Sequence, residues 1–139
     1  MIYALDTNTI SYYLRGEGRV NEHFQREIIE NSNIYAISYF CAYEIQRWLN
    51  YKPTRIIRSY AKQFDVLFQN VRELADMPAS VWEKAVDIHI ALQSKGQLIG
   101  DADILIAPYC LVNGYTLVTR NTGDFERIDG LNFVNWYQG

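Results

Sequence analysis

The fold is decided by the first eight residues of the chain, Met1-Ile2-Tyr3-Ala4-Leu5-Asp6-Thr7-Asn8. The short apolar run from Ile2 to Leu5 favours a fully buried strand. Polar residues that favour turns and helix N-caps come next, so Asp6 is expected at the carboxyl end of a central parallel strand. Open α/β sheets place their ligand sites at such strand ends. Asp6 could also simply cap the next helix, and a ligand site requires that other carboxylates reach the same place.

Length and composition predict one globular domain over residues 1–139. The hydrophobic content of 49% and the charged content of 21% argue against disorder. No apolar run is long enough to span a membrane and no leader precedes the first strand, so we expect a cytoplasmic protein without a membrane anchor. Cys41 and Cys110 lie in apolar surroundings and, with only two histidines, are too few for a cysteine-based metal site.

Strands and helices are expected to alternate along the chain. Buried strand-like runs cover residues 2–5, 34–37, 71–74, 115–119 and 132–135. Helical patterns cover residues 9–14, 18–30, 39–49, 55–68, 78–94 and 101–112, with Ser38 as an N-cap and a loop or short helical turn at 120–125. This alternation predicts a three-layer α/β/α fold with a central, mainly parallel sheet and helices on both faces.

Three further acids, Glu44, Asp103 and Asp124, fall near expected strand ends or helix starts, as Asp6 does. In a parallel sheet these positions face one crevice. Crowded carboxylates raise one another's pKa, and a divalent cation removes that cost. Oxygen ligands without histidine or cysteine favour Mg²⁺ or Mn²⁺ over Zn²⁺. Such an ion lowers the pKa of a bound water and holds a phosphate oxygen, as hydrolysis of a phosphodiester requires.

Each acid also has an explanation that needs no metal. Glu44 could be an exposed residue of an amphipathic helix, and Asp124 could be a loop residue or a cap. Asp101 and Asp103 both suit a helix N-terminus through capping and the helix dipole. We assign Asp101 as a cap or outer residue and Asp103 as a ligand, because the four acids together are hard to explain without a cation.

Four ordered segments of this sequence are similar to those of the PIN-domain nucleases, and specifically of the VapC-like toxins of bacterial toxin–antitoxin pairs. The segments are Tyr3 to Asn8, Ile37-Ser38 with Glu44, Ile99 to Ala107, and Leu117 to Asn121 with Asp124-Phe125, followed by Gly130-Leu131 and Asn135-Trp136. The resemblance covers nearly the whole chain, and its specificity lies in the ordered set rather than in any one segment.

The resemblance implies a Mg²⁺-dependent endoribonuclease that an antitoxin holds inactive and that forms a homodimer. It implies an acidic site of Asp6, Glu44, Asp103 and Asp124, with polar support from Thr7, Asn8 and Asn121. Three positions depart from the family pattern. Trp48 replaces a small residue beside Glu44, Asn121 stands where many members have a second acid, and Pro108 lies inside a helix that it could kink.

A basic and aromatic stretch is the candidate surface for RNA. Between Ile45 and Phe64 the chain has five basic residues and no acid, with three aromatic residues interleaved: Arg47, Lys52, Arg55, Arg58, Lys62, Trp48, Tyr51 and Tyr60. Basic and aromatic side chains together suit single-stranded or loop RNA. A solvated helix face with core aromatics is the alternative, and it is the better interpretation of Arg58 and Lys62. Arg120, beside the acidic site, is a stronger candidate for a contact with the phosphate that is cut.

Two other functions compete with the ribonuclease. Asp6-Thr7-Asn8-Thr9 superficially resembles the nucleophile motif of the haloacid dehalogenase-type phosphatases, but that motif needs a second aspartate where Asn8 stands. The other is a partner-binding protein that helps an antitoxin repress its own operon and has little or no nuclease activity.

Overall fold

The apolar run at the N-terminus forms β1 (Ile2–Leu5), which lies in the middle of a four-stranded parallel sheet. β1 pairs with β2 (Ile34–Ala36) on one side and with β3 (Thr116–Val118) on the other, and β3 pairs with β4 (Phe133–Val134). This computed structural model describes residues 1–71 and 77–138. Of the strand predicted at residues 71–74, all but Val71 lies outside the described residues, and Val71 is not in a strand.

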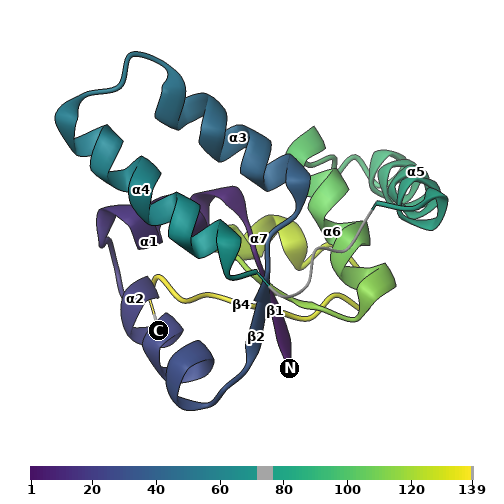
Figure 1. The fold of residues 1–139 in the computed structure, drawn as a ribbon. Coiled ribbons are helices and arrows are strands. Elements are labelled where there is room, and N and C mark those ends of the chain that lie inside the picture. The colour runs from purple at the N-terminus through teal and green to yellow at the C-terminus, as the bar shows by residue number, and fades with distance from the viewer. Residues whose placement is uncertain (72–76, 139) are drawn as a thin grey trace.

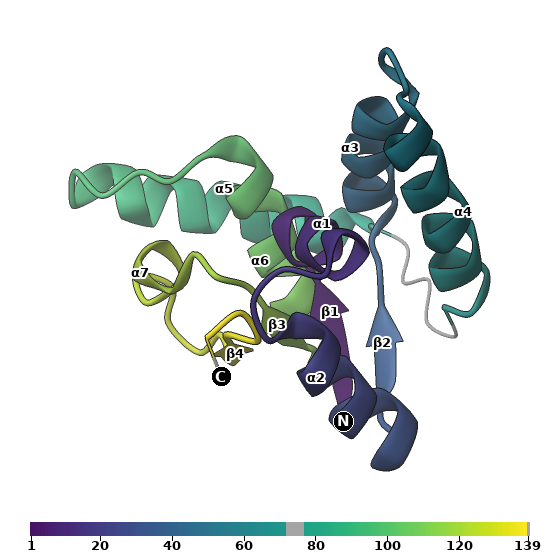
Figure 2. The ribbon, with the colours of Figure 1, turned by 90° about the vertical axis from the view of Figure 1, so that its left-hand side faces the viewer.

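Seven α-helices and one π-helix accompany the sheet in the described part of the chain. They are α1 (Thr7–Arg15), α2 (Val20–Phe24), η1 (Gln25–Glu30), α3 (Tyr39–Asn50), α4 (Arg55–Gln69), α5 (Ala79–Ser94), α6 (Asp101–Asn113) and α7 (Thr122–Phe125). Helices α3 and α4 run side by side as a hairpin beyond the carboxyl ends of β1 and β2 (Figure 1, Figure 2). The predicted α/β fold with a parallel sheet flanked by helices is therefore confirmed.

Polar residues at the strand ends start the helices that follow. The Asp6 carboxylate oxygen Oδ1 accepts a hydrogen bond from the Thr9 backbone N–H at 2.8 Å, so α1 begins at Thr7, two residues before the predicted start. Helix α1 ends at Gly16, which adopts a left-handed conformation with a φ of 67°. Ser38 caps α3 as predicted, because its hydroxyl accepts a hydrogen bond from the Cys41 N–H at 3.1 Å.

The single helix predicted over residues 18–30 is wrong in two respects. Helix α2 begins at Val20, because Gly18 has a φ of 63°, which no right-handed helix accommodates. From Gln25 the backbone continues as the π-helix η1, and the Asn31 N–H donates to the Arg26 carbonyl five residues earlier. Further along the chain, Pro108 lies within α6, which is assigned as helix on both sides of it.

The register of the sheet brings distant polar residues together. Leu5 is paired with Val118, and the Asp6 N–H donates to the Val118 carbonyl at 3.3 Å. Asp6 and Thr119 therefore lie next to each other at the carboxyl edge, above a core that includes the fully buried Leu117. In the ranges 1–71 and 77–138, no helix has the length and apolar character that crossing a membrane requires.

Candidate active site

Asp6 is a buried carboxylate in the centre of the carboxyl edge of the sheet. Only 8% of its surface is exposed, and it accepts hydrogen bonds from the Thr9 N–H and from the side chain of Thr119. Burial raises the pKa of the Asp6 carboxyl, with a smaller contribution in the same direction from the negative charge of Glu44. Asp6 therefore caps α1, as one of the two explanations from the sequence expected, and it also lines a cavity with other acids, as a ligand site requires.

That cavity has a volume of about 120 Å³ and is bordered by three of the four predicted acids, Asp6, Glu44 and Asp103. They come from the end of β1, the second turn of α3 and the first turn of α6. The remaining lining residues are Thr7, Asn8, Phe40, Cys41, Ala102 and Ile106. Segments that are far apart in the sequence therefore bring their carboxylates to one small cavity, as the parallel topology predicts.

Short hydrogen bonds orient the acids around the cavity. The Thr7 hydroxyl donates to Glu44 Oε1 at 2.6 Å. The side-chain amide of Asn121 donates to Asp103 Oδ2 and to Asp124 Oδ2, both at 2.9 Å. Asp124 does not line the cavity, but it is linked to Asp103 through Asn121. Its Oδ1 also lies 3.7 Å from a guanidinium nitrogen of Arg127. Thr7 and Asn121, to which the family resemblance gives a supporting role, therefore each hydrogen-bond to an acid, and Asn121 joins two acids.

Negative charge accumulates at Asp103. Burial raises the pKa of this carboxyl, and the charges of Asp6, Asp124 and Glu44 raise it further, while the hydrogen bond from Asn121 acts in the opposite direction. The cavity therefore holds acids whose mutual repulsion would be relieved by a cation.

A hard divalent cation fits this donor set by its chemistry. Within the described residues, Glu44 Oε2 and Asp103 Oδ1 make no hydrogen bond to the protein, so each carboxylate keeps one oxygen for a ligand. In the same ranges no group of three acidic, histidine or cysteine side chains stands in a metal-ligating arrangement. All the acids are oxygen donors, which favours Mg²⁺ or Mn²⁺.

Cys41 lines the cavity but has the properties of a packing residue. It is buried, and burial raises the pKa of its thiol to about 11. A nucleophilic cysteine needs a lowered pKa, so covalent catalysis by Cys41 is disfavoured.

Several other candidate residues lie elsewhere. Asp101 is exposed, does not line the cavity and is not a cap, because Gly100 occupies the N-cap position of α6.

The basic residues predicted to bind RNA are exposed on or between α3 and α4; they are Arg47, Lys52 and Arg55. The Arg47 guanidinium lies over the ring of Tyr43, and the Lys52 ammonium lies over the ring of Tyr51. Trp48 and Tyr60 contact each other at 6.1 Å between ring centroids, so they pack α3 against α4. Both side chains are partly buried against the core, which favours the alternative of core aromatics for this pair.

Thr119 and Phe40 also lie at the site, although neither was predicted there from the sequence. Thr119 is fully buried, and its hydroxyl oxygen accepts a hydrogen bond from the Asn121 N–H at 3.0 Å while its side chain contacts Asp6. Its position gave a usable signal, because it is a polar residue directly after a buried strand. Phe40 gave none, since it is one apolar residue among many.

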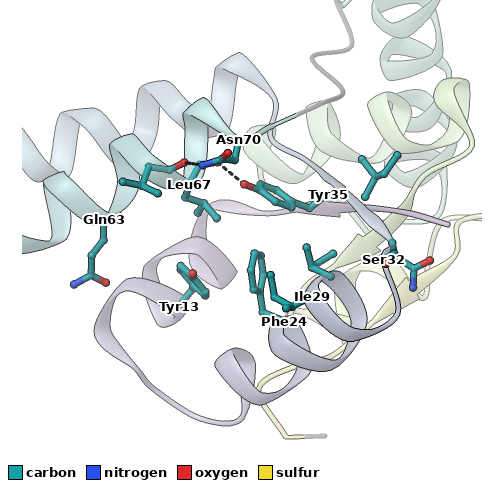
Figure 3. Close-up of a pocket in the computed structure, with 12 residues that line it drawn as sticks. Tyr13, Phe24, Ile29, Ser32, Tyr35, Gln63, Leu67 and Asn70 are labelled. Carbon is teal, nitrogen blue, oxygen red and sulfur yellow. Dashed lines mark hydrogen bonds between the residues drawn. The ribbon is translucent and has the colours of Figure 1, made fainter.

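A second, larger cavity of about 610 Å³ lies on another part of the molecule, between β2, α1, α2, η1 and α4. Figure 3 shows Tyr13 and Phe24 below it and Leu67 of α4 above it, with Ile29 and Tyr35 alongside. We call it the apolar groove. None of its lining residues is acidic or basic, so it has no catalytic group of the kind found in the first cavity.

Replacing Asp103 by asparagine is expected to raise the melting temperature of the metal-free protein at pH 7 by a few degrees. A carboxyl whose pKa is raised by folding contributes stability below its usual pKa and loses it as pH rises through the raised value. Asparagine carries no charge to repel Asp6 and Glu44, so the gain should disappear near pH 4. Thermal melts of the wild type, Asp103→Asn and the exposed control Asp101→Asn measure it, and an equal gain in both variants would contradict the site electrostatics.

Comparison with known proteins identifies the family. The family model for the PIN domain matches residues 3–131. Ribonuclease VapC2 of Rickettsia felis is 31% identical over 136 residues, which cover 98% of each chain. The tRNA(fMet)-specific endonuclease VapC of Shigella flexneri is 30% identical over 81 residues, covering 58% of this chain and 55% of the relative.

Solved structures agree. The crystal structure of VapBC2 from Rickettsia felis, bound to a DNA fragment from its promoter, contains a chain with a TM-score of 0.82 and 28% identity, covering 98% of this chain and 99% of that one. VapBC-5 from Mycobacterium tuberculosis, a member of the VapBC family of toxin–antitoxin systems, has a TM-score of 0.70 and 15% identity over 96% of each chain, a likeness of fold. The chain belongs to the PIN domain family.

Proposed function

We propose that the protein is a metal-dependent endoribonuclease that acts as a toxin and is inhibited by a cognate antitoxin. The observation that carries the proposal is the convergence of Asp6, Glu44 and Asp103 on one small cavity in a PIN domain. The full-length similarity to a ribonuclease VapC supports RNA as the substrate, and the tRNA-specific relative makes tRNA the first RNA to test.

The three cavity acids are proposed to hold the cation, with Mg²⁺ as the physiological ion and Mn²⁺ as an alternative. When bound, the cation lowers the pKa of a water and offsets the charge of the phosphate. Thr7 holds Glu44, and Asn121 holds Asp103 beside Asp124, so these polar residues keep the acids facing the cavity. Asp124 either binds a second cation or orients the attacking water. Asn8 lines the cavity and is exposed, so it can contact the RNA.

Cleavage of RNA is expected to depend on a divalent metal. Purified protein incubated with a tRNA pool should cut the tRNA in the presence of Mg²⁺ or Mn²⁺. Cleavage should stop when EDTA is added and resume when Mg²⁺ is added in excess. Gel analysis of the products measures this. Cleavage that continues in EDTA would contradict metal dependence, and no cleavage with any divalent metal would favour the non-enzymatic alternative.

The apolar groove is the surface that we assign to the antitoxin. Ile29 and Val66 at this groove are 58% and 60% exposed, and large apolar surfaces of this kind mark interaction sites. The structural relative from Rickettsia felis was solved as a VapBC assembly, and this supports an antitoxin as the occupant of an exposed apolar surface. The antitoxin should therefore supply apolar side chains to the groove.

One alternative function, repression of an operon together with the antitoxin, is supported by a separate observation. A role in repressing an operon together with the antitoxin is compatible with the ribonuclease, because the Rickettsia felis assembly is bound to promoter DNA. The phosphatase alternative is set aside, because the chain belongs to the PIN domain family and has Asn8 where that motif needs an aspartate.

We also propose a single domain over residues 1–139 and action in the cytoplasm, where RNA and antitoxin meet. The homodimer stays a prediction.

A further inference from the structure

Three segments that are distant in the sequence meet at an arginine beside the candidate site. The Arg120 guanidinium carbon lies 3.7 Å from the centre of the Tyr137 ring and 5.7 Å from the centre of the Tyr12 ring. The two rings contact each other edge to face, with centroids 4.8 Å apart. We call these three residues the arginine clasp. It joins α1, the end of β3 and the C-terminal segment.

The arginine clasp is connected to the acids through the chain neighbours of Arg120. Arg120 stands in the chain between Thr119, whose side chain contacts Asp6, and Asn121, whose amide holds Asp103 and Asp124. Tyr12 lies in α1, the helix that Asp6 caps. The residues on both sides of Arg120 thus contact the acids, while its own side chain lies on Tyr137 and Tyr12 at the same edge of the sheet.

Tyr137 is held in place from several directions. Its carbonyl accepts a hydrogen bond from the Arg19 N–H at 2.9 Å, and its own N–H donates to Asn135 Oδ1 at 2.8 Å. A Cβ at Gly18 would lie 2.7 Å and 2.8 Å from two carbons of the Tyr137 ring and 2.8 Å from its carbonyl oxygen, so only glycine leaves room for the ring. This fixed ring provides a rigid support for the side chain of Arg120.

The charge of Arg120 is not neutralised by an acid. Arg15, Arg19, Arg26 and Arg127 each lie within 4.0 Å of a carboxylate, whereas Arg120 makes no such ion pair within residues 1–71 and 77–138. Arg120 is also exposed. The Arg120 guanidinium also interacts with the side chains of Tyr12 and Tyr137 through hydrogen bonds. A guanidinium has five N–H donors, so others remain for the paired hydrogen bonds that a phosphate accepts.

We propose that Tyr137, together with Tyr12, is a positioning residue that holds Arg120 ready for a backbone phosphate of the RNA close to the bond that is cut. This proposal rests on the proposed ribonuclease function. An exposed arginine side chain samples many rotamers, and the two rings select one of them before RNA binds. The tyrosines act through Arg120, so their contribution exists only while the arginine is present.

A double-mutant cycle tests this dependence. All variants carry Asp6→Asn, so that RNA is not cut, and the binding of a short fluorescent single-stranded RNA is measured across a series of salt concentrations. Arg120→Gln and Tyr137→Leu should each weaken binding about five- to tenfold and reduce the slope of log K against log salt by about 0.7, the value for one lost phosphate contact. Tyr137→Phe keeps the ring and should bind as the parent does.

Tyr137→Leu should have no further effect when Arg120 is already glutamine. An equal loss from Tyr137→Leu with and without Arg120, or an unchanged salt slope, would overturn the proposal. If Tyr137→Leu fails to fold, Tyr12→Leu is tested in the same cycle with the same criteria. Absence of RNA cleavage by the wild type counts against the ribonuclease, whereas normal cleavage with a flat cycle counts against the arginine clasp alone.

Discussion

Asp6→Asn is expected to reduce RNA cleavage at least about 100-fold, which corresponds to about 2.7 kcal/mol of transition-state stabilisation. Asparagine has nearly the size of aspartate and caps helices equally well, so the hydrogen bond from the Thr9 N–H to Oδ1 is retained. The change removes one negative charge from the cavity, where only 8% of the surface of Asp6 is exposed. The loss should therefore come from the chemistry of the site and leave the fold unchanged.

The measurement is the rate of tRNA cleavage at saturating Mg²⁺, with a thermal melt of each variant. Asp101→Asn is the matched control, because Asp101 is an exposed acid at the start of α6 that does not line the cavity, and its activity should stay within about twofold of the wild type, as is usual for surface substitutions. Retention of more than a tenth of the wild-type rate by Asp6→Asn would show that the acids of this cavity do not carry the reaction.

Val66→Glu and Ile29→Glu are each expected to weaken antitoxin binding about 100-fold or more. Either change would place an unpaired charge against apolar side chains of the antitoxin in the apolar groove, which carries a large desolvation cost. Both residues are more than half exposed in the free protein, so stability should change by less than about 0.5 kcal/mol. RNA cleavage by the free toxin should be unaffected, because the groove is separate from the acidic cavity.

Isothermal titration with the purified antitoxin, sought first in the reading frame immediately upstream, measures the effect. Ile56→Glu is the control, since Ile56 is 56% exposed in the first turn of α4, the helix that carries Val66, and does not line the groove. Equal affinities for Val66→Glu and Ile56→Glu would show that the antitoxin binds elsewhere.

The sheet and three of its acids were predictable because local signals agreed with the tertiary structure. The short apolar run of β1 favours a buried strand over any other element. An acid directly after a strand must lie at the carboxyl end of that strand. Parallel pairing then forces Asp6, Glu44 and Asp103 to the same edge. The start of α1 was predicted two residues late, because Asp6 itself acts as the cap and Thr9 offered an equally good signal.

Contacts between distant side chains were not predictable. Asn121 donates to Asp103, which is 18 residues earlier in the sequence, and to Asp124. The family resemblance implied a supporting role for Asn121, but a single amide in a loop does not indicate which acids it joins. Trp48 and Tyr60 pack together although their basic neighbours suggested a surface for RNA. Arg120 was expected to face a phosphate, and nothing in the sequence indicated that Tyr137 would support it.

The central position of β1 has a consequence for synthesis of the toxin on the ribosome. The first carboxylate of the cavity is translated at position 6, but the strand that completes its surroundings is β3, whose last residue is Val118. At about 5–20 residues per second, roughly 6–20 seconds separate the two. A nascent or prematurely terminated chain that lacks β3 therefore cannot complete the surroundings of Asp6, and the cavity assembles only after residue 118 has been translated.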